Sequence, residues 1–373
     1  MIYADHAATT ALSPTAYAAM KPWLQEKYGN PSTLHSLGRD PRKAIASSRE
    51  IIAECIGAKP EEIFFTSGGT EADNWALTGF AFRSPERRGK IITSSIEHHA
   101  ILNTCDFLKR IGYGISLLPV SNDGIVSIDT LEDYLRDDAL LVSIMLANNE
   151  IGTIEPIQDL AKVTHQHGGI FHTDAVQAVG HIPVNVMNLC IDMLSASAHK
   201  FNGPKGVGFL YIREGLSIEP LLHGGAQEKG MRAGTESVAN IVGMAVALEE
   251  HMKTLKEDAQ YLRRLSNTLL TSLREEGLDF LVNGSDDRIP GSLSLSFNNT
   301  EGELLLHRLD LIGTAVATGS ACDSKNTVIS HVIRAIGVPE AYAHGTIRIT
   351  LGRENTEEEM RLISTQIKRI IGN

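Results

Sequence analysis

Residues 63–71 read Ile63-Phe-Phe-Thr-Ser-Gly-Gly-Thr-Glu71, where a short apolar run is followed by a glycine turn and then by a helical pattern. An apolar run of this kind is typical of a strand that is buried on both faces. The same order recurs at residues 90–93, which precede a helical pattern over residues 98–111. Further buried-strand candidates are residues 140–146, 169–173 and 192–196. Short buried strands separated by amphipathic helices predict an α/β fold with a mostly parallel sheet that is covered on both faces.

The pattern changes after a long helical stretch over residues 238–275, whose second half is charged. Beyond it, residues 292–297 and 346–351 are strand-like and residues 302–311 are helix-like. A last helix starts near Thr356, where the sequence Thr-Glu-Glu-Glu suits a capping box and the helix dipole. These elements predict a second, smaller α+β domain.

Composition narrows the class of protein. The chain has 373 residues, enough for two or three structural units at roughly 150 residues each. Its net charge of −11 argues against a general binder of nucleic acid or of anionic lipid. We find no apolar run of roughly 18 residues, no secretory signal and no transit segment, so we expect a cytoplasmic protein without membrane contact. Four scattered cysteines without a CxxC pair argue against a disulfide framework or a zinc cage.

Three segments near the predicted strands carry reactive or anion-binding groups. Lys200 follows a strand and precedes a Gly/Pro-rich turn, where a partly dehydrated amine can attack an aldehyde, although such a lysine taken alone is more often an exposed loop residue. Asp174 follows another strand and would pair with a protonated pyridine nitrogen or, equally, cap a helix. The turn at residues 66–71 offers backbone N–H groups to an anion at a helix N-terminus, although many strand–helix turns look alike. Further candidate phosphate donors are Ser197, His199 and the distant Thr235.

Two further segments offer an imidazole and a thiol. In Glu97-His98-His99, an imidazole could stack on an aromatic cofactor and move protons. The rival interpretation is a metal site that includes His165 and His167, but the usual ligand spacings are missing and we expect no metal. Cys322 lies among small and polar residues, which favours an exposed loop and makes it the best nucleophile, although a loop cysteine taken alone is more often inert. The other cysteines lie in apolar or helical patterns and are expected to be buried: Cys55, Cys105 and Cys190.

A lysine, an aspartate, a histidine and an anion seat on one α/β chain match the needs of pyridoxal phosphate chemistry. The motifs that carry a resemblance are Tyr3-Ala-Asp-His-Ala-Ala-Thr-Thr10, Gly29-Asn-Pro-Ser-Thr-Leu-His35, Thr66-Ser-Gly-Gly-Thr-Glu71, Asn148-Asn-Glu-Ile-Gly152, His172-Thr-Asp-Ala-Val-Gln177, His199-Lys200 and Gly319-Ser-Ala-Cys322. Over nearly its whole length the chain resembles cysteine desulfurases of the NifS/IscS type, in the class V aminotransferase family. The resemblance implies the type I fold of pyridoxal phosphate enzymes, with a mostly parallel seven-stranded sheet flanked by helices. It also implies a large cofactor-binding domain over residues 14–256 and a small domain, from residues 1–13 and 257–373, that carries the Cys322 loop.

The same resemblance implies the roles of the cofactor-binding residues. Lys200 would hold pyridoxal 5′-phosphate through its amine and carry protons, and His98 would stack on the ring and take part in acid–base steps. Asp174 would face the pyridine nitrogen and Gln177 the phenolic oxygen. The implied phosphate ligands are Gly69, Thr70, Ser197, His199 and, from the other subunit of a homodimer, Thr235.

The implied substrate is L-cysteine, and the implied products are alanine and a persulfide. Arg348 would bind the substrate carboxylate with its planar guanidinium, helped by Asn149. Cys322 as a thiolate would attack the substrate sulfur, and its loop would deliver the sulfur to an acceptor protein in iron–sulfur cluster assembly, tRNA thiolation or DNA sulfur modification. The alternative is a selenocysteine lyase or an aminotransferase of the same fold, which the thiol loop disfavours.

Three features depart from the family pattern. Asp323 stands beside Cys322 where threonine is common, and an ionised carboxylate there would disfavour the thiolate. His6 stands where asparagine is more usual. The sequence ends at Asn373 without the tail through which IscS-type enzymes contact their iron–sulfur scaffold, so we expect a different acceptor.

Overall fold

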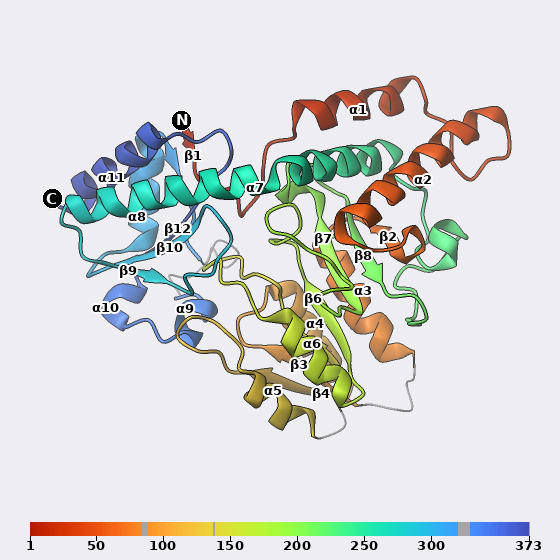
Figure 1. Cartoon of the computed structure of the whole chain (residues 1–373), viewed down its shortest axis with the longest axis horizontal. Helices are drawn as coiled ribbons and strands as arrows, with labels where there is room; N and C mark the ends of the chain where they lie inside the picture. Colours follow the sequence, from red (N-terminus) through yellow and green to blue (C-terminus); the bar gives the residue numbers. More distant parts are fainter. Residues whose placement is uncertain (84–88, 137–138, 320–328, 373) are drawn as a thin grey trace.

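The computed structural model describes residues 1–83, 89–136, 139–319 and 329–372 (Figure 1). Its largest sheet has seven strands, and their spatial order is β2 (Ile63–Thr66), β8 (Gly208–Ile212), β7 (Met193–Ser197), β6 (Ile170–Asp174), β5 (Ala139–Ser143), β3 (Lys90–Ser94) and β4 (Gly114–Leu118). The neighbours from β4 to β7 are parallel, while β8 is antiparallel to both β7 and β2. The α/β prediction with a mostly parallel sheet is therefore confirmed.

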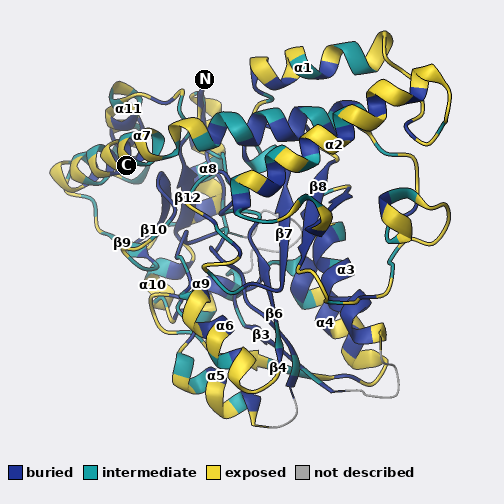
Figure 2. Cartoon of the chain, turned by 45° about the vertical axis from the view of Figure 1, so that its right-hand side comes forward, coloured by how far each residue is buried: buried dark blue, intermediate teal, exposed yellow. Residues whose placement is uncertain are grey.

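Helices cover both faces of this sheet because successive strand residues point to opposite sides. On β2, Phe64 packs with α3 (Gly69–Phe82) and α4 (His99–Arg110). Its neighbours Ile63 and Phe65 belong to the core on the other face. The helices that contribute to that second core are α2 (Ser36–Ile56), α5 (Ile128–Leu135), α6 (Ile157–Gln166) and the first half of α7 (Val238–Glu275). Figure 2 shows the central strands as buried, whereas the outer helix faces are exposed.

Helix α7 joins this core to a smaller one. Met244 and Leu248 in its first half pack against the large sheet, whereas Leu265 and Leu269 in its second half pack against the smaller sheet. The smaller sheet is antiparallel and has the order β12 (Thr346–Thr350), β10 (Ser292–Phe297) and β9 (Phe280–Asn283). Helices α8 (Gly302–Leu311) and α11 (Glu357–Ile371) contribute to the same core. The predicted domain boundary after residue 256 would fall inside α7, and it stays a proposal.

The chain start lies with the C-terminal part, as Figure 1 shows. Strand β1 (Ile2–Tyr3) pairs in parallel with β11 (Thr314–Ala315), and Ile2 is buried in the smaller core. The remaining described helices are α1 (Pro14–Gln25), α9 (His331–Ala335) and α10 (Glu340–Ala343). Among the described helices, none combines the length and the apolar character that crossing a membrane requires.

Two local predictions have different outcomes. The capping box at α11 is confirmed, because Thr356 Oγ1 accepts the Glu359 N–H (3.2 Å) and Glu359 Oε2 accepts the Thr356 N–H (3.0 Å). The expectation of three buried cysteines is correct for Cys105 but wrong for Cys55 and Cys190, which are half-buried. Cys190 lies in a turn with a φ of 57°, so its side chain is not enclosed by a regular element.

Candidate active site

The predicted reactive residues meet at one edge of the large sheet, at the carboxyl ends of β6 and β7 and of β2, which β8 separates from β7. Thr66 at the end of β2 and Ser197 at the end of β7 are both paired with Gly208 of β8. Asp174 ends β6, the next strand along. Lys200 follows β7 in a short 3-10 turn over Ala198–Lys200. Open α/β sheets bind ligands at this edge, and the structure brings these predicted site residues together there.

The Lys200 amine lies against the N-terminal segment, residues 5–10. Its Nζ donates to the carbonyl oxygens of Ala7 (2.5 Å) and Ala8 (3.0 Å). Gln177 Nε2 donates to the same Ala7 carbonyl at 3.0 Å. His199 Nδ1 lies 3.1 Å from Thr9 Oγ1. The motif at residues 3–10 is therefore part of the site, because its backbone and hydroxyl groups hold three predicted cofactor residues.

Lys200, Asp174 and His98 form one electrostatic group. Burial raises the pKa of Asp174, while His98, the Val176 N–H and Lys200 act to lower it. Burial lowers the pKa of His98, and Asp174 opposes this shift. His98 is also the N-cap of α4, where its Nδ1 accepts the Ala100 N–H at 3.1 Å. A ring nitrogen that accepts a hydrogen bond carries no proton, so the neutral His98 ring holds its proton on Nε2.

The sequence analysis gave no role to two buried carboxyl groups that lie near Asp174. Asp73 on α3 is buried, and burial raises its pKa well above the ordinary value, with Asp174 acting in the same direction. Burial also raises the pKa of Glu97 to about 8. Glu97 is therefore mostly protonated at neutral pH, and burial next to Asp174 favours the protonated form of Asp73. The signal in the sequence is that Asp73 lies near the start of a mostly apolar stretch, Ala72–Ala81.

A buried histidine spans the sheet beneath the site. His172 Nδ1 lies 2.8 Å from Ser143 Oγ, and its Nε2 lies 3.0 Å from Ser195 Oγ. Burial lowers the pKa of His172 to about 3, so the ring is neutral and serves as a hydrogen-bonding bridge between strands. The sequence analysis had assigned no role to His172, although it lies in the motif at residues 172–177.

The N-terminus of α3 is shaped to receive a phosphate. Gly68, its N-cap residue, has a φ of 149° and no side chain to cap the helix, and its N–H donates to Thr66 Oγ1 at 3.3 Å. A Cβ atom on Gly69 would lie 2.6 Å from Val176 Cγ2, which explains a glycine at this position. Ser197 Oγ lies 3.5 Å from where a Cβ atom of Gly68 would be, so its hydroxyl is at the seat. A helix N-terminus that begins with two glycines and has a serine hydroxyl beside it fits an anionic phosphate group.

The other two predicted phosphate ligands are exposed. Thr70 is the second residue of α3, and Thr235 lies in the loop before α7. The phosphate-binding roles of Thr70 and Thr235 both remain predictions. Thr235 is expected to act on the other subunit of a dimer.

Arg348 on β12 is almost completely buried, with 7% of its side chain exposed. Its Nη1 donates to the Asn149 carbonyl (2.8 Å) and its Nη2 to Asp5 Oδ1 (2.8 Å). Nε is buried and has no hydrogen-bond partner among the described residues. Asn149 thus meets Arg348 through its backbone, and Asp5 is a partner that the sequence did not suggest. A buried guanidinium with an unpaired edge is suited to bind a carboxylate.

Cys322 and Asp323 lie outside the described residues, but the flanks of their segment are described. Ala317 exchanges two backbone hydrogen bonds with Arg348 (3.0 and 2.6 Å). On the other flank, Ser330 Oγ donates to Glu150 Oε2 at 2.6 Å, and burial raises the pKa of Glu150 to about 7. The described flank at Ala317 therefore lies beside Arg348, and the flank at Ser330 lies beside Glu150.

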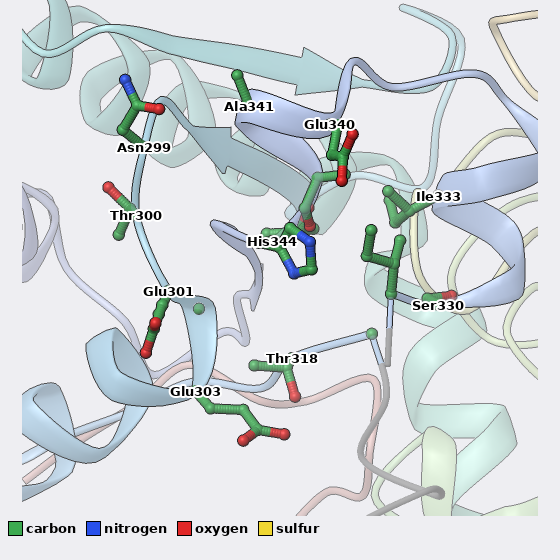
Figure 3. A pocket seen from close by; sticks show the side chains of 15 residues that line it. Asn299, Thr300, Glu301, Glu303, Thr318, Ser330, Ile333, Glu340, Ala341 and His344 are labelled. Atoms are coloured by element: carbon green, nitrogen blue, oxygen red, sulfur yellow. The ribbon is translucent and has the colours of Figure 1, made fainter. Parts of the chain in front are cut away.

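A cavity of about 530 Å³ lies beside these flanks (Figure 3). Thr318 and Ser330 line it, and so do three acidic residues: Glu301, Glu303 and Glu340. Within the described part of the chain, no three His, Cys, Asp or Glu side chains lie close enough together to hold one metal ion.

Comparisons with known proteins identify the family of the chain. The family model described as "Aminotransferase class-V" matches residues 2–363. A cysteine desulfurase IscS of Dictyoglomus turgidum is 51% identical over 371 residues, which are 99% of this chain and 94% of that protein. One of Methanosarcina thermophila is 45% identical over 99% of this chain and 92% of its own. Among solved structures, a NifS-like protein is 39% identical with a TM-score of 0.94 and covers 100% of this chain and 99% of its own. SspA in complex with cysteine is 37% identical with a TM-score of 0.85 and covers 94% and 99%.

Proposed function

The chain belongs to the aminotransferase class-V family, and we propose that it is a cysteine desulfurase that uses pyridoxal 5′-phosphate. It converts L-cysteine to L-alanine and passes the sulfur through Cys322 to an acceptor protein. The observation that carries the proposal is the electrostatic group at the sheet edge, in which Lys200, Asp174 and His98 come from three separate segments. This group contains an amine, a carboxylate and a proton carrier, and pyridoxal phosphate chemistry needs all three.

The residues present fit the cofactor. Lys200 would bind its aldehyde carbon, Asp174 its ring nitrogen and Gln177 its phenolic oxygen, while His98 would stack on the ring. The phosphate would bind at the N-terminus of α3, and its ligands would be Gly69, Thr70, Ser197, His199 and, in a homodimer, the partner subunit's Thr235. When bound, the cofactor supplies an electron sink for the carbon chemistry of the substrate.

The chain's own residues bind the substrate and move its protons. Arg348 binds the substrate carboxylate with the guanidinium edge that contains the unpaired Nε. Lys200 takes and returns the α-proton with its amine, and His98 holds a proton at Nε2 for the acid–base steps. Asp174 would place a carboxylate at the ring nitrogen, and His98 and Lys200 favour its charged form.

Cys322 carries out the sulfur transfer. Its thiolate forms a bond to the substrate sulfur while the substrate Cβ–S bond breaks. The electron pair of that bond stays with the three-carbon skeleton, which takes up a proton and leaves as alanine. The persulfide on Cys322 then passes its outer sulfur to the acceptor.

The test is alanine release from L-cysteine in the presence of a thiol reductant, with Cys322→Ala compared with the wild type. We expect alanine from the wild type and little from Cys322→Ala. Cys190→Ala is the matched control, because Cys190 is a half-buried thiol in another part of the chain, and it should retain wild-type activity. Equal alanine release from all three proteins would refute the role of Cys322, and no release from the cofactor-loaded wild type would refute the proposed substrate.

A further inference from the structure

Arg232 and Glu71 join the loop before α7 to the first turn of α3. Arg232 Nε lies 2.8 Å from Glu71 Oε1, and its Nη2 lies 3.1 Å from Glu71 Oε2, so the pair is bidentate. Glu71 Oε2 also accepts the Ser67 N–H at 2.8 Å. Both side chains are largely buried, with 20% of Arg232 and 12% of Glu71 exposed. A pair of this geometry is shielded from solvent, so its interaction free energy is larger than that of a surface ion pair.

The same loop has a second, independent anchor. Glu228 Oε1 and Oε2 accept hydrogen bonds from Arg49 (2.6 and 2.8 Å), and Oε2 also accepts the Phe65 N–H at 2.9 Å. Glu228 and Lys229 have φ angles of 47° and 60°, in the left-handed region, so this part of the loop is held in one conformation by its surroundings. Loss of Arg232 would therefore leave the loop attached to the edge of the large sheet.

Glu71 creates an electrostatic problem at the phosphate seat. It is the third residue of α3 and lies in the first helical turn, where a carboxylate is favourable for the helix but repels a bound phosphate. Burial alone would raise the pKa of Glu71, but the bonds from Arg232 and Ser67 outweigh burial and lower it. The Glu71 charge is therefore present at neutral pH, next to the seat.

We propose that Arg232 is a positioning residue that neutralises Glu71 and so allows the N-terminus of α3 to bind the phosphate monoester of the cofactor. This inference rests on the proposed function, because it assumes that the phosphate of pyridoxal phosphate occupies this seat. It assigns to Arg232 no contact with the phosphate itself. The effect is carried by charge, and it should disappear when Glu71 loses its charge.

The experiment measures the affinity of cofactor-free protein for pyridoxal phosphate and for pyridoxal, which lacks the phosphate. Binding is followed by the absorption change that appears when the Lys200 amine takes up the aldehyde. The variants are Arg232→Gln, Glu71→Gln and the double variant. Lys59→Gln is the matched control, because it removes one positive charge from an exposed pair with Glu214 (2.5 Å) elsewhere on the surface.

We expect Arg232→Gln to bind pyridoxal phosphate roughly tenfold more weakly, since it leaves a largely buried charge unpaired. Its affinity for pyridoxal should be unchanged. Glu71→Gln should bind pyridoxal phosphate as tightly as the wild type or more tightly, and the double variant should regain most of the lost affinity. Lys59→Gln should bind both compounds as the wild type does.

Several results would overturn the inference. An unchanged affinity of Arg232→Gln for pyridoxal phosphate would do so. An equal loss for both compounds, or a loss in Glu71→Gln that the double variant does not reverse, would show that the pair is purely structural. If the wild type gave no absorption change with pyridoxal phosphate, the proposed function itself would fail, which is a distinguishable result.

Discussion

Replacement of Arg348 by lysine should strongly impair substrate binding. The guanidinium is 7% exposed, and it already donates to the Asn149 carbonyl and to Asp5. A lysine ammonium has no planar fork, so it cannot keep these bonds and also pair with both oxygens of a carboxylate. Loss of one charge-assisted hydrogen bond to the substrate costs about 2–3 kcal/mol, which is a decrease of about 30- to 150-fold in kcat/KM.

The assay is alanine release at increasing concentrations of L-cysteine, with the protein saturated with cofactor. We expect most of the effect in KM, because the carboxylate contact is made in the ground state as well as in the transition state. Arg288→Lys is the matched control. Arg288 is also largely buried, and it donates to the carbonyl oxygens of Asn283 and Gly284 (3.3 Å each). A wild-type KM in Arg348→Lys, or the same rise in KM in both variants, would refute the role assigned to Arg348.

Three further changes should give clear outcomes. Burial raises the pKa of Glu155 from 4.5 to about 8, so the protonated side chain stabilises the folded state and this stabilisation is lost as the pH rises through this window. In urea unfolding, the free energy of unfolding of Glu155→Gln should therefore rise by about 2–3 kcal/mol relative to that of the wild type between about pH 6 and about pH 9. Parallel pH profiles of the two proteins would contradict this. Asp323→Thr should lower the pKa of Cys322 in a pH-dependent alkylation assay, and an unchanged or higher pKa would exclude the proposed effect of the carboxylate. Gly69→Ala should weaken binding of pyridoxal phosphate, because the added Cβ would meet Val176 Cγ2 at 2.6 Å; Val176→Ala added to it should restore part of the affinity, and a failure to do so would point to another cause.

The helices and strands whose bounds the sequence predicted best are those with a regular pattern of apolar residues along their own length. The bounds of α7, β10 and α8 agree with the predicted ranges, because each has a regular apolar pattern over its full length. Strand β4 was not predicted, and its residues are mostly exposed or half-buried, so it lacks the continuous apolar run of a central strand. Helix α2 was not predicted either, because Gly38 and Pro41 near its start read as helix breakers.

In the candidate site, too, some features could be predicted from the sequence and others could not. Lys200 and Asp174 could be located because they follow strands, and strand ends share one edge of a parallel sheet. Asp5 could not be connected with Arg348, since 343 positions separate them and no spacing rule covers such a contact. The Glu71–Arg232 pair, 161 positions apart, was hidden for the same reason. Reactive residues that belong to one local segment could be predicted from the sequence. The ion pairs around them could be identified only from the fold.

His6, where the resemblance led us to expect asparagine, lies in a segment that contacts two parts of the site. Asp5 contacts Arg348, while the carbonyl groups of Ala7 and Ala8 contact Lys200, so one short segment positions both the carboxylate-binding arginine and the lysine. The His6 ring packs edge-on against Tyr3, with a centroid distance of 4.9 Å. It also lies against Gly352, where an added Cβ would come within 2.2 Å of the ring. Histidine is therefore accommodated at this position because residue 352 is glycine, and the packing of these two residues fixes the segment on which both Arg348 and Lys200 depend.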